Sequence, residues 1–136
     1  MTVERYEHVV VLRIRVPANQ PANSFLPVDM VFDPQLPAVQ QQTVPSNEAW
    51  VIDDVYVTAS QSIDAILVFM KGLKEEMART SPINSLLVSN PSRPRMAPLL
   101  YNGTEILSIN AINLQAGGTS DTILTAYMKL VRFVAR

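Results

Sequence analysis

The stretch at residues 43–57, TVPSNEAWVIDDVYV, contains the only tryptophan of the chain and, shortly after it, two adjacent aspartates within a strand-like pattern. Strict alternation from Trp50 would place Asp54 among the apolar side chains and leave neither face cleanly apolar. If one extra residue is inserted at Asp53 and Asp54, Tyr56 points outward and one face becomes wholly apolar: Trp50, Ile52, Val55 and Val57. A single inserted residue that changes the register is a β-bulge. The sequence therefore predicts a bulged strand with both aspartates exposed.

The two aspartates could instead form a catalytic carboxylate pair. Glycosidases place two carboxyl groups roughly 5 to 9.5 Å apart on either side of one bond. Adjacent residues of a strand project to opposite faces, and at a bulge they lie side by side rather than across a cleft. Burying the aspartates unpaired would cost on the order of several kcal/mol each. The solvated bulge is therefore the preferred interpretation of Asp53 and Asp54.

Alternation with a period of two recurs along the rest of the chain, and helical periodicity is scarce. Strands are expected from residue 6 to 16, over 25–32, 63–70, 83–89, 104–115 and 122–134. The segment 63–70 is apolar on both faces, which is typical of a strand that is covered by another layer or lies at a subunit contact. In the segment 104–115, Asn110 and Ala111 are predicted to break the alternation as the aspartates do. The segment 73–82, LKEEMARTSP, is the one helix-like piece.

These elements predict one all-β domain over residues 1–136, since a chain of this length suits a single core. We expect a two-sheet antiparallel sandwich of jelly-roll type, with about eight strands and at most one short helix near 73–79. An open Greek-key barrel is the alternative.

The composition narrows the classes of function. Charged residues are 17% of the chain, against about 25% in typical domains, which indicates surface covered by neighbouring subunits. A net charge of −1 gives no electrostatic footprint for nucleic acid. No signal peptide is recognisable, and the longest uncharged apolar run, residues 65–70, is too short to span a membrane. We therefore expect a soluble protein.

No motif predicts a catalytic, metal or cofactor site. The chain has no cysteine, four glycines and a single histidine, His8, which is expected to be structural. It contains no G-x-S-x-G nucleophile turn and no phosphate-binding glycine loop. Trp50 at the start of a strand is expected to anchor the core.

The segments VPSNEAWVIDDVYV, SIDAILVFMKG and PLLYNGTEILSINAINLQAGGTSDTILTAYMKLVRFV together resemble the small single jelly-roll capsid proteins of tailless icosahedral viruses with an internal membrane. The resemblance spans most of the chain as a pattern of strands and turns. It implies dimers or trimers that tile a shell lattice in the virion, with no catalytic residues. It also implies other capsid proteins as partners and membrane contact only as part of a shell around the internal membrane. The N-terminus lacks the basic arm of shell proteins that touch their genome, so no direct nucleic-acid contact is expected.

The leading hypothesis is a self-associating capsid or virion subunit without enzymatic activity. The expected subunit contacts are apolar or basic and lie on strands or in a proline-rich loop: Phe25, Ile66, Val68, Met70, Arg93 and Arg95. The alternative is a binding module, such as a phage receptor-binding head or a carbohydrate-binding sandwich, that uses outward polar residues: Tyr56, Asn110, Asn113 and Gln115. A third hypothesis is a small enzyme that uses Asp53, Asp54 and His8.

Overall fold

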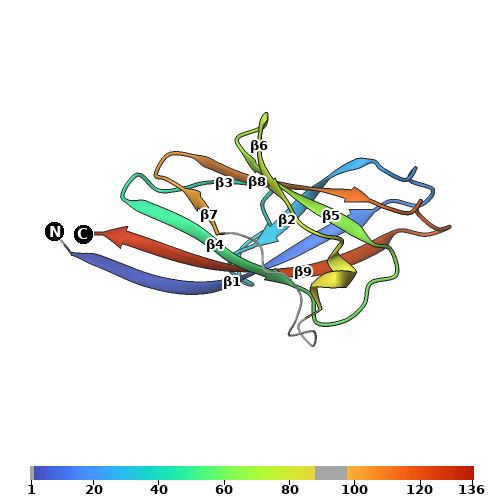
Figure 1. Cartoon of the computed structure of the whole chain (residues 1–136), viewed down its shortest axis with the longest axis horizontal. Coiled ribbons are helices and arrows are strands. Elements are labelled where there is room, and N and C mark those ends of the chain that lie inside the picture. Colours follow the sequence, from blue (N-terminus) through green and yellow to red (C-terminus); the bar gives the residue numbers. More distant parts are fainter. Residues whose placement is uncertain (1, 88–97) are drawn as a thin grey trace.

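The computed structural model describes residues 2–87 and 98–136 (Figure 1). Within these ranges the chain consists of β-strands, connecting loops and a single 3₁₀ turn, so the predicted all-β class is confirmed. The elements are β1 (Val3–Val16), β2 (Phe25–Val31), β3 (Gln41–Thr43), β4 (Glu48–Tyr56), β5 (Ala65–Lys71), β6 (Glu75–Arg79), η1 (Ile83–Leu86), β7 (Leu99–Tyr101), β8 (Ile106–Asn113) and β9 (Thr122–Ala135).

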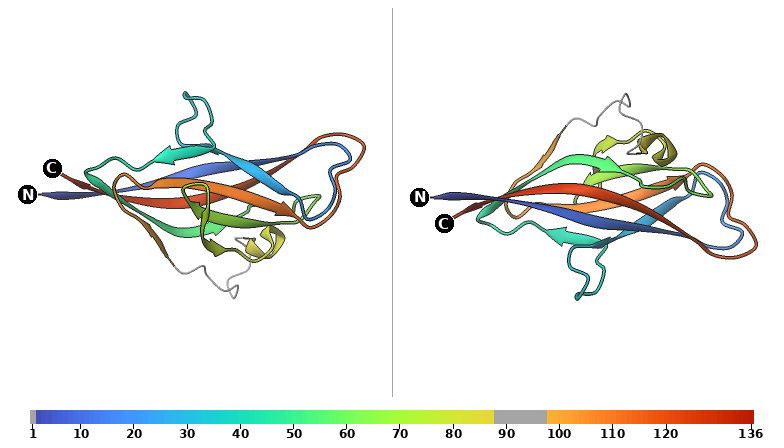
Figure 2. Two further views of the ribbon diagram at one scale, coloured as in Figure 1. Left: turned by 90° about the horizontal axis from the view of Figure 1, so that it is seen from above. Right: turned by 90° about the horizontal axis from the view of Figure 1, so that it is seen from below.

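The strands form two layers of antiparallel sheet (Figure 2). One layer has the order β1-β9-β4-β7 and the other has the order β2-β8-β5-β6, with β3 also pairing β8. In both layers strands that are distant in sequence lie side by side, and this order is that of a jelly roll. Pairing of β1 with β2 over Val11 to Ile14 joins the two layers along one side. The expected antiparallel sandwich is confirmed, and this join makes it nearly a closed barrel.

The core lies between the layers because every second residue of each strand points inward. The first layer contributes alternate residues of β1 and β9, which pair along the whole of both strands. The second layer contributes alternate residues of β5 and β8. The largest fully buried apolar side chains include Leu12, Ile14, Ile52, Leu67, Phe69, Ile109 and Met128.

The bulge in β4 is confirmed. Ile52 lies opposite Leu130 of β9 and Asp54 lies opposite Lys129, so Asp53 is the extra residue. The predicted apolar face is buried as a set: Trp50, Ile52, Val55 and Val57. The Asp53 side chain is 42% exposed, and its carboxylate lies 3.3 Å from the Lys129 ammonium on the outer face. The aspartates therefore mark how the strand is built.

The predicted break in β8 is wrong. The register with β5 runs without interruption from Ala65 opposite Asn113 to Lys71 opposite Leu107. Alternation therefore continues, and Asn113 points into the protein while Ile112 points outward. The apolar residue at 112 and the polar residue at 113 suggested that Ile112 points inward and Asn113 outward. The inward position is instead polar, because the side-chain amide of Asn113 forms hydrogen bonds with the backbone of the loops.

The helix expected near 73–79 is also wrong, because residues 75–79 form β6. Gly72, with a φ of +70°, turns the chain after β5, and β6 pairs back along β5. Strand pairing here overrides the helix propensity of the KEEMAR run. The strand expected at 83–89 is a 3₁₀ turn over Ile83–Leu86 in its described part. Across the described ranges, no helix has the length and apolar character needed to cross a membrane.

Candidate functional site

The outer face of the β2-β8-β5 layer carries a row of apolar side chains. The register places Phe25 of β2 opposite Ile112 of β8, and Ile112 opposite Ile66 of β5. Phe25 is 53% exposed, and both isoleucines are partly exposed. The structure thus brings together two of the expected contact residues, Phe25 and Ile66. Ile112, which lies between them, was not expected on this face because the register predicted after Asn110 is wrong.

The other expected contact residues differ from this pair. Val68 and Met70 share the outer face of β5 with Ile66, yet both are buried within the single chain. A second subunit could reach little of either side chain in this structure, and their assignment as subunit contacts stays a prediction. Arg93 and Arg95 lie outside the described residues.

β1 and β9 reach the termini together at one end of the sandwich (Figure 1). A cluster of polar side chains occupies this end. The inward positions of β1 are apolar from Val10 to Val16, but toward the N-terminus the same face carries Glu4, Tyr6 and His8. The register places Arg132 of β9 between Tyr6 of β1 and Trp50 of β4, and Glu48 lies two residues before Trp50 on β4. The apolar face of β1 therefore becomes polar along one strand.

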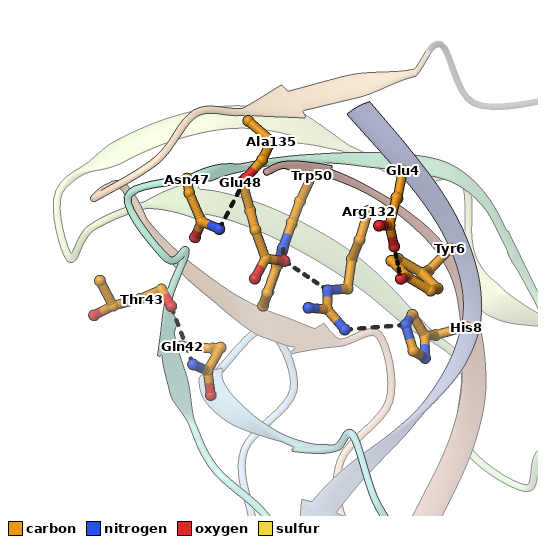
Figure 3. Close-up of polar contacts among 10 residues, drawn as sticks. All are labelled: Glu4, Tyr6, His8, Gln42, Thr43, Asn47, Glu48, Trp50, Arg132 and Ala135. Carbon is orange, nitrogen blue, oxygen red and sulfur yellow. Dashed lines mark hydrogen bonds and ion pairs between the residues drawn. The ribbon is translucent and has the colours of Figure 1, made fainter. Parts of the chain in front are cut away.

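Arg132 is the centre of this cluster (Figure 3). Its Nε donates to Glu48 Oε1 at 2.7 Å, and its Nη1 lies 3.3 Å from His8 Nε2. The indole N–H of Trp50 donates to the same Glu48 oxygen at 2.9 Å. The Arg132 guanidinium also lies 5.9 Å from the centre of the Tyr6 ring, and the Tyr6 hydroxyl donates to Glu4.

The pair of Glu48 and Arg132 is largely withdrawn from solvent, with side chains 8% and 31% exposed. The hydrogen bond from Arg132 holds the pKa of the Glu48 carboxyl below its ordinary value, against the opposing effect of burial. Glu48 is therefore a carboxylate acceptor and not a proton donor at neutral pH. Its two bonds fix both the arginine and the edge of the core at Trp50.

The cluster forms one wall of a pocket of about 440 Å³, whose lining residues include His8, Phe32, Gln42, Trp50 and Arg132. This size is within the range of small-ligand sites. Trp50 is almost fully buried, however, and its ring packs against Phe32 with centroids 5.7 Å apart. The indole thus serves the core, as predicted, and offers no open face for a sugar ring.

The residues of the enzyme hypothesis do not converge. His8 lines the pocket on the inner face, while Asp53 bonds Lys129 on the outer face of the same sheet. Asp54 Oδ1 accepts the N–H of Val55, its own neighbour in the chain. Among the described residues, no group of three or more histidine, cysteine, aspartate or glutamate side chains is arranged to hold a metal ion.

The residues of the binding-module hypothesis are also dispersed. Tyr56 stacks on Tyr127 of β9, with ring centres 5.4 Å apart. Asn113 is fully buried, and the Gln115 side chain accepts the N–H of Asp64 at 2.7 Å. Of the four residues, Asn110 and Tyr56 are the ones left partly exposed on a sheet face.

No protein-family model matches the chain, and no curated protein is significantly similar to it in sequence.

Proposed function

We propose that the protein is a structural subunit of a virion shell that acts by self-association. The observation that carries this proposal is the outward row of Phe25, Ile112 and Ile66. The solvent side of an antiparallel sheet normally carries polar residues, so three neighbouring strands with apolar side chains in one row indicate a covered surface. The low share of charged residues agrees with a surface that neighbouring subunits cover.

The virion assignment draws on the strand order and on the resemblance to single jelly-roll capsid proteins. Jelly rolls also occur in lectins and cupins, so the fold alone does not select a shell protein. Self-association through a sheet face is the property that separates a lattice subunit from those classes. This proposal entails further copies of the same chain as the main partners and other capsid proteins as additional partners.

The test is the mass in solution, measured by light scattering over a wide range of concentration, with electron microscopy of the heavier fractions. We expect dimers or trimers and larger assemblies that grow with concentration. Phe25→Ser should shift this growth to higher concentration. The matched control is Leu73→Ser, because Leu73 is 71% exposed but lies in the turn after β5, away from the row. A protein that stays monomeric at all concentrations would refute the proposal.

The pocket beside Trp50 favours the binding module as a second candidate. Its polar lining groups, Gln42 and Arg132, suit a small polar ligand. A monomeric protein that binds a glycan on an array, and loses it on Gln42→Ala, would move the assignment there. Without such binding, the pocket is a structural feature of the sandwich end.

A further inference from the structure

The first half of β1 has one unpaired edge. Residues 3–10 pair with β9 from Val3 opposite Ala135 to Val10 opposite Met128, while β2 pairs β1 only from Val11 to Ile14. Within residues 2–87 and 98–136, no other strand pairs with residues 3–10. Figure 2 shows β1 and β9 projecting together toward the termini. Long open edges of this kind are templates for pairing with another chain.

The main-chain hydrogen bonds fix which residues face this open edge. Thr2 and Arg136 exchange both bonds, with the N–H of each donating to the carbonyl of the other at 3.0 and 2.8 Å. In an antiparallel pair such doubly bonded positions alternate along the strand. Even-numbered residues of β1 therefore direct their N–H and C=O groups to β9. The odd-numbered residues direct theirs to the open edge: Val3, Arg5, Glu7 and Val9.

We propose that this edge pairs antiparallel with the same edge of a second copy, about a twofold axis at Tyr6. The odd-numbered residues must lie opposite odd-numbered residues, which leaves few registers. With the axis at Tyr6, Arg5 lies opposite Glu7, Glu4 opposite His8, and Val3 opposite Val9. Moving the axis to residue 5 sets Arg5 against itself, and moving it to residue 7 sets Glu7 against itself. Like charges directly opposite are unfavourable, so the charge order selects Tyr6.

The side chains at this edge suit the contact. Val3 and Val9 are 58% and 53% exposed, and each would cover the other across the axis. Arg5 Nη2 lies 2.9 Å from Glu7 Oε1 within the chain, and both side chains are about half exposed. In the pair these residues and their symmetry mates form a square of alternating charge. About eight main-chain hydrogen bonds would link the two copies, so one sheet would continue through both subunits.

This inference rests on the proposed self-association and specifies one of its contacts. A contact about a twofold axis is closed and gives a dimer. The apolar row of Phe25, Ile112 and Ile66 lies on the other layer and is free to join such dimers into a lattice. The two surfaces can therefore be tested separately.

The register can be tested by disulfide trapping, since the chain has no cysteine of its own. In Tyr6→Cys the two thiols would face each other at a pair without mutual hydrogen bonds, where Cβ atoms are about 4.5–5.5 Å apart, close to disulfide geometry. We expect a covalent dimer after mild oxidation. Glu4→Cys alone should not cross-link, because its symmetry mate is about 13 Å away along the strand. Glu4→Cys mixed with His8→Cys should cross-link.

The charge order gives a second test that does not depend on a thiol. By symmetry Arg5→Glu introduces two like-charge pairs, which should weaken dimerisation by about tenfold. The double variant Arg5→Glu with Glu7→Arg should restore it. Circular dichroism verifies that each variant is folded.

The outcomes separate the two proposals. If the wild type self-associates but Tyr6→Cys does not cross-link, or the double charge variant does not recover, the register is wrong and the proposed function stands. If the wild type is monomeric throughout and no variant cross-links, both are overturned. Cross-linking of Tyr6→Cys together with recovery of the double variant establishes the dimer.

Discussion

Replacement of Asn113 by alanine should destabilise the fold far more than its place on a predicted outer face would suggest. The Asn113 side chain is fully buried at the end of β8. Its Oδ1 accepts the N–H of Ser24 at 2.9 Å, and its Nδ2 donates to the carbonyls of Pro21 and Gln115, both at 2.9 Å. These three bonds tie the loop before β2 to the loop after β8.

The magnitude follows from what each partner can do afterwards. The N–H of Ser24 is partly buried, so leaving it without an acceptor costs about 1–3 kcal/mol. Pro21 and Gln115 are exposed residues, so their carbonyls can bond water, and each lost bond costs about 0.5–1.5 kcal/mol. Together the loss is about 4 kcal/mol of the free energy of unfolding. With a urea m-value near 2 kcal/mol/M, the midpoint falls by about 2 M.

The assay is urea unfolding followed by circular dichroism, with Asn110→Ala as the matched control. Asn110 is the same residue type on the same strand, but it lies half-buried on the outer face. We expect its replacement to change stability by less than about 0.5 kcal/mol. Equal effects of the two substitutions would refute the assignment of Asn113 to the interior.

Asn113→Asp separates the hydrogen bonds from the loss of volume. A carboxylate can still accept from Ser24, but it can only repel the carbonyl oxygens of Pro21 and Gln115. Burial would raise the pKa of this carboxyl, so its folded form binds a proton more readily than its unfolded form. The variant should therefore be less stable than Asn113→Ala at neutral pH and should regain stability as the pH falls. A penalty that does not change with pH would contradict this.

Three further predictions concern β4. Trp50→Ala should lower the free energy of unfolding by about 3–5 kcal/mol, and Trp50→Phe should lower it clearly less. Unfolding is followed by circular dichroism, because each variant removes the only tryptophan of the chain. Equal losses in the two variants would contradict a packing role. Asp53→Ala should change stability by less than about 0.5 kcal/mol, because its ion pair with Lys129 is exposed. Deletion of Asp53 should instead cost more than about 4 kcal/mol, because it forces a slip of the strand register. A stable deletion variant would contradict the bulge. Glu48→Gln should lose most stability at neutral pH. Because the folded pKa of Glu48 lies below its ordinary value of 4.5, the carboxylate stabilises the fold above that value, and this contribution disappears as the pH falls through the lowered pKa. The two proteins should therefore converge in acid, and a constant difference would count against the pair with Arg132.

The features predicted correctly from the sequence depend on contrast between apolar and polar positions. In β4 the aspartates are the only charged residues between Trp50 and Val57, so the bulge was visible as a change of face. In β8 the same reasoning failed, because Asn113 is a buried polar residue and Ile112 is a partly exposed apolar one. That exchange depends on backbone groups of Pro21 and Ser24, which are distant in sequence. No local pattern contains this information.

The pairing of each strand with its neighbours in the sheet could likewise not be predicted from the sequence. Residues 75–79 carry glutamate, alanine and arginine, which favour a helix in isolation, and only the adjacent edge of β5 makes them a strand. The row of Phe25, Ile112 and Ile66 likewise exists only because β8 lies between β2 and β5. The strand order of a jelly roll therefore determines surfaces that the separate strands do not reveal.

The sequence of β1 contains one further pattern that bears on function. Along one face the residues change from valine, leucine and isoleucine at positions 10–16 to Glu4, Tyr6 and His8. The alternation of the strand continues although its inward face becomes polar. This indicates that the strand extends beyond the layer that covers it. At the same point β2 stops pairing with it, so the strand loses a neighbour as well as a cover. Arg132 and Glu48 satisfy the uncovered face from within the chain. The open edge of β1 has no strand partner among the described residues, and its charge order is the basis for the proposed pairing with a second copy.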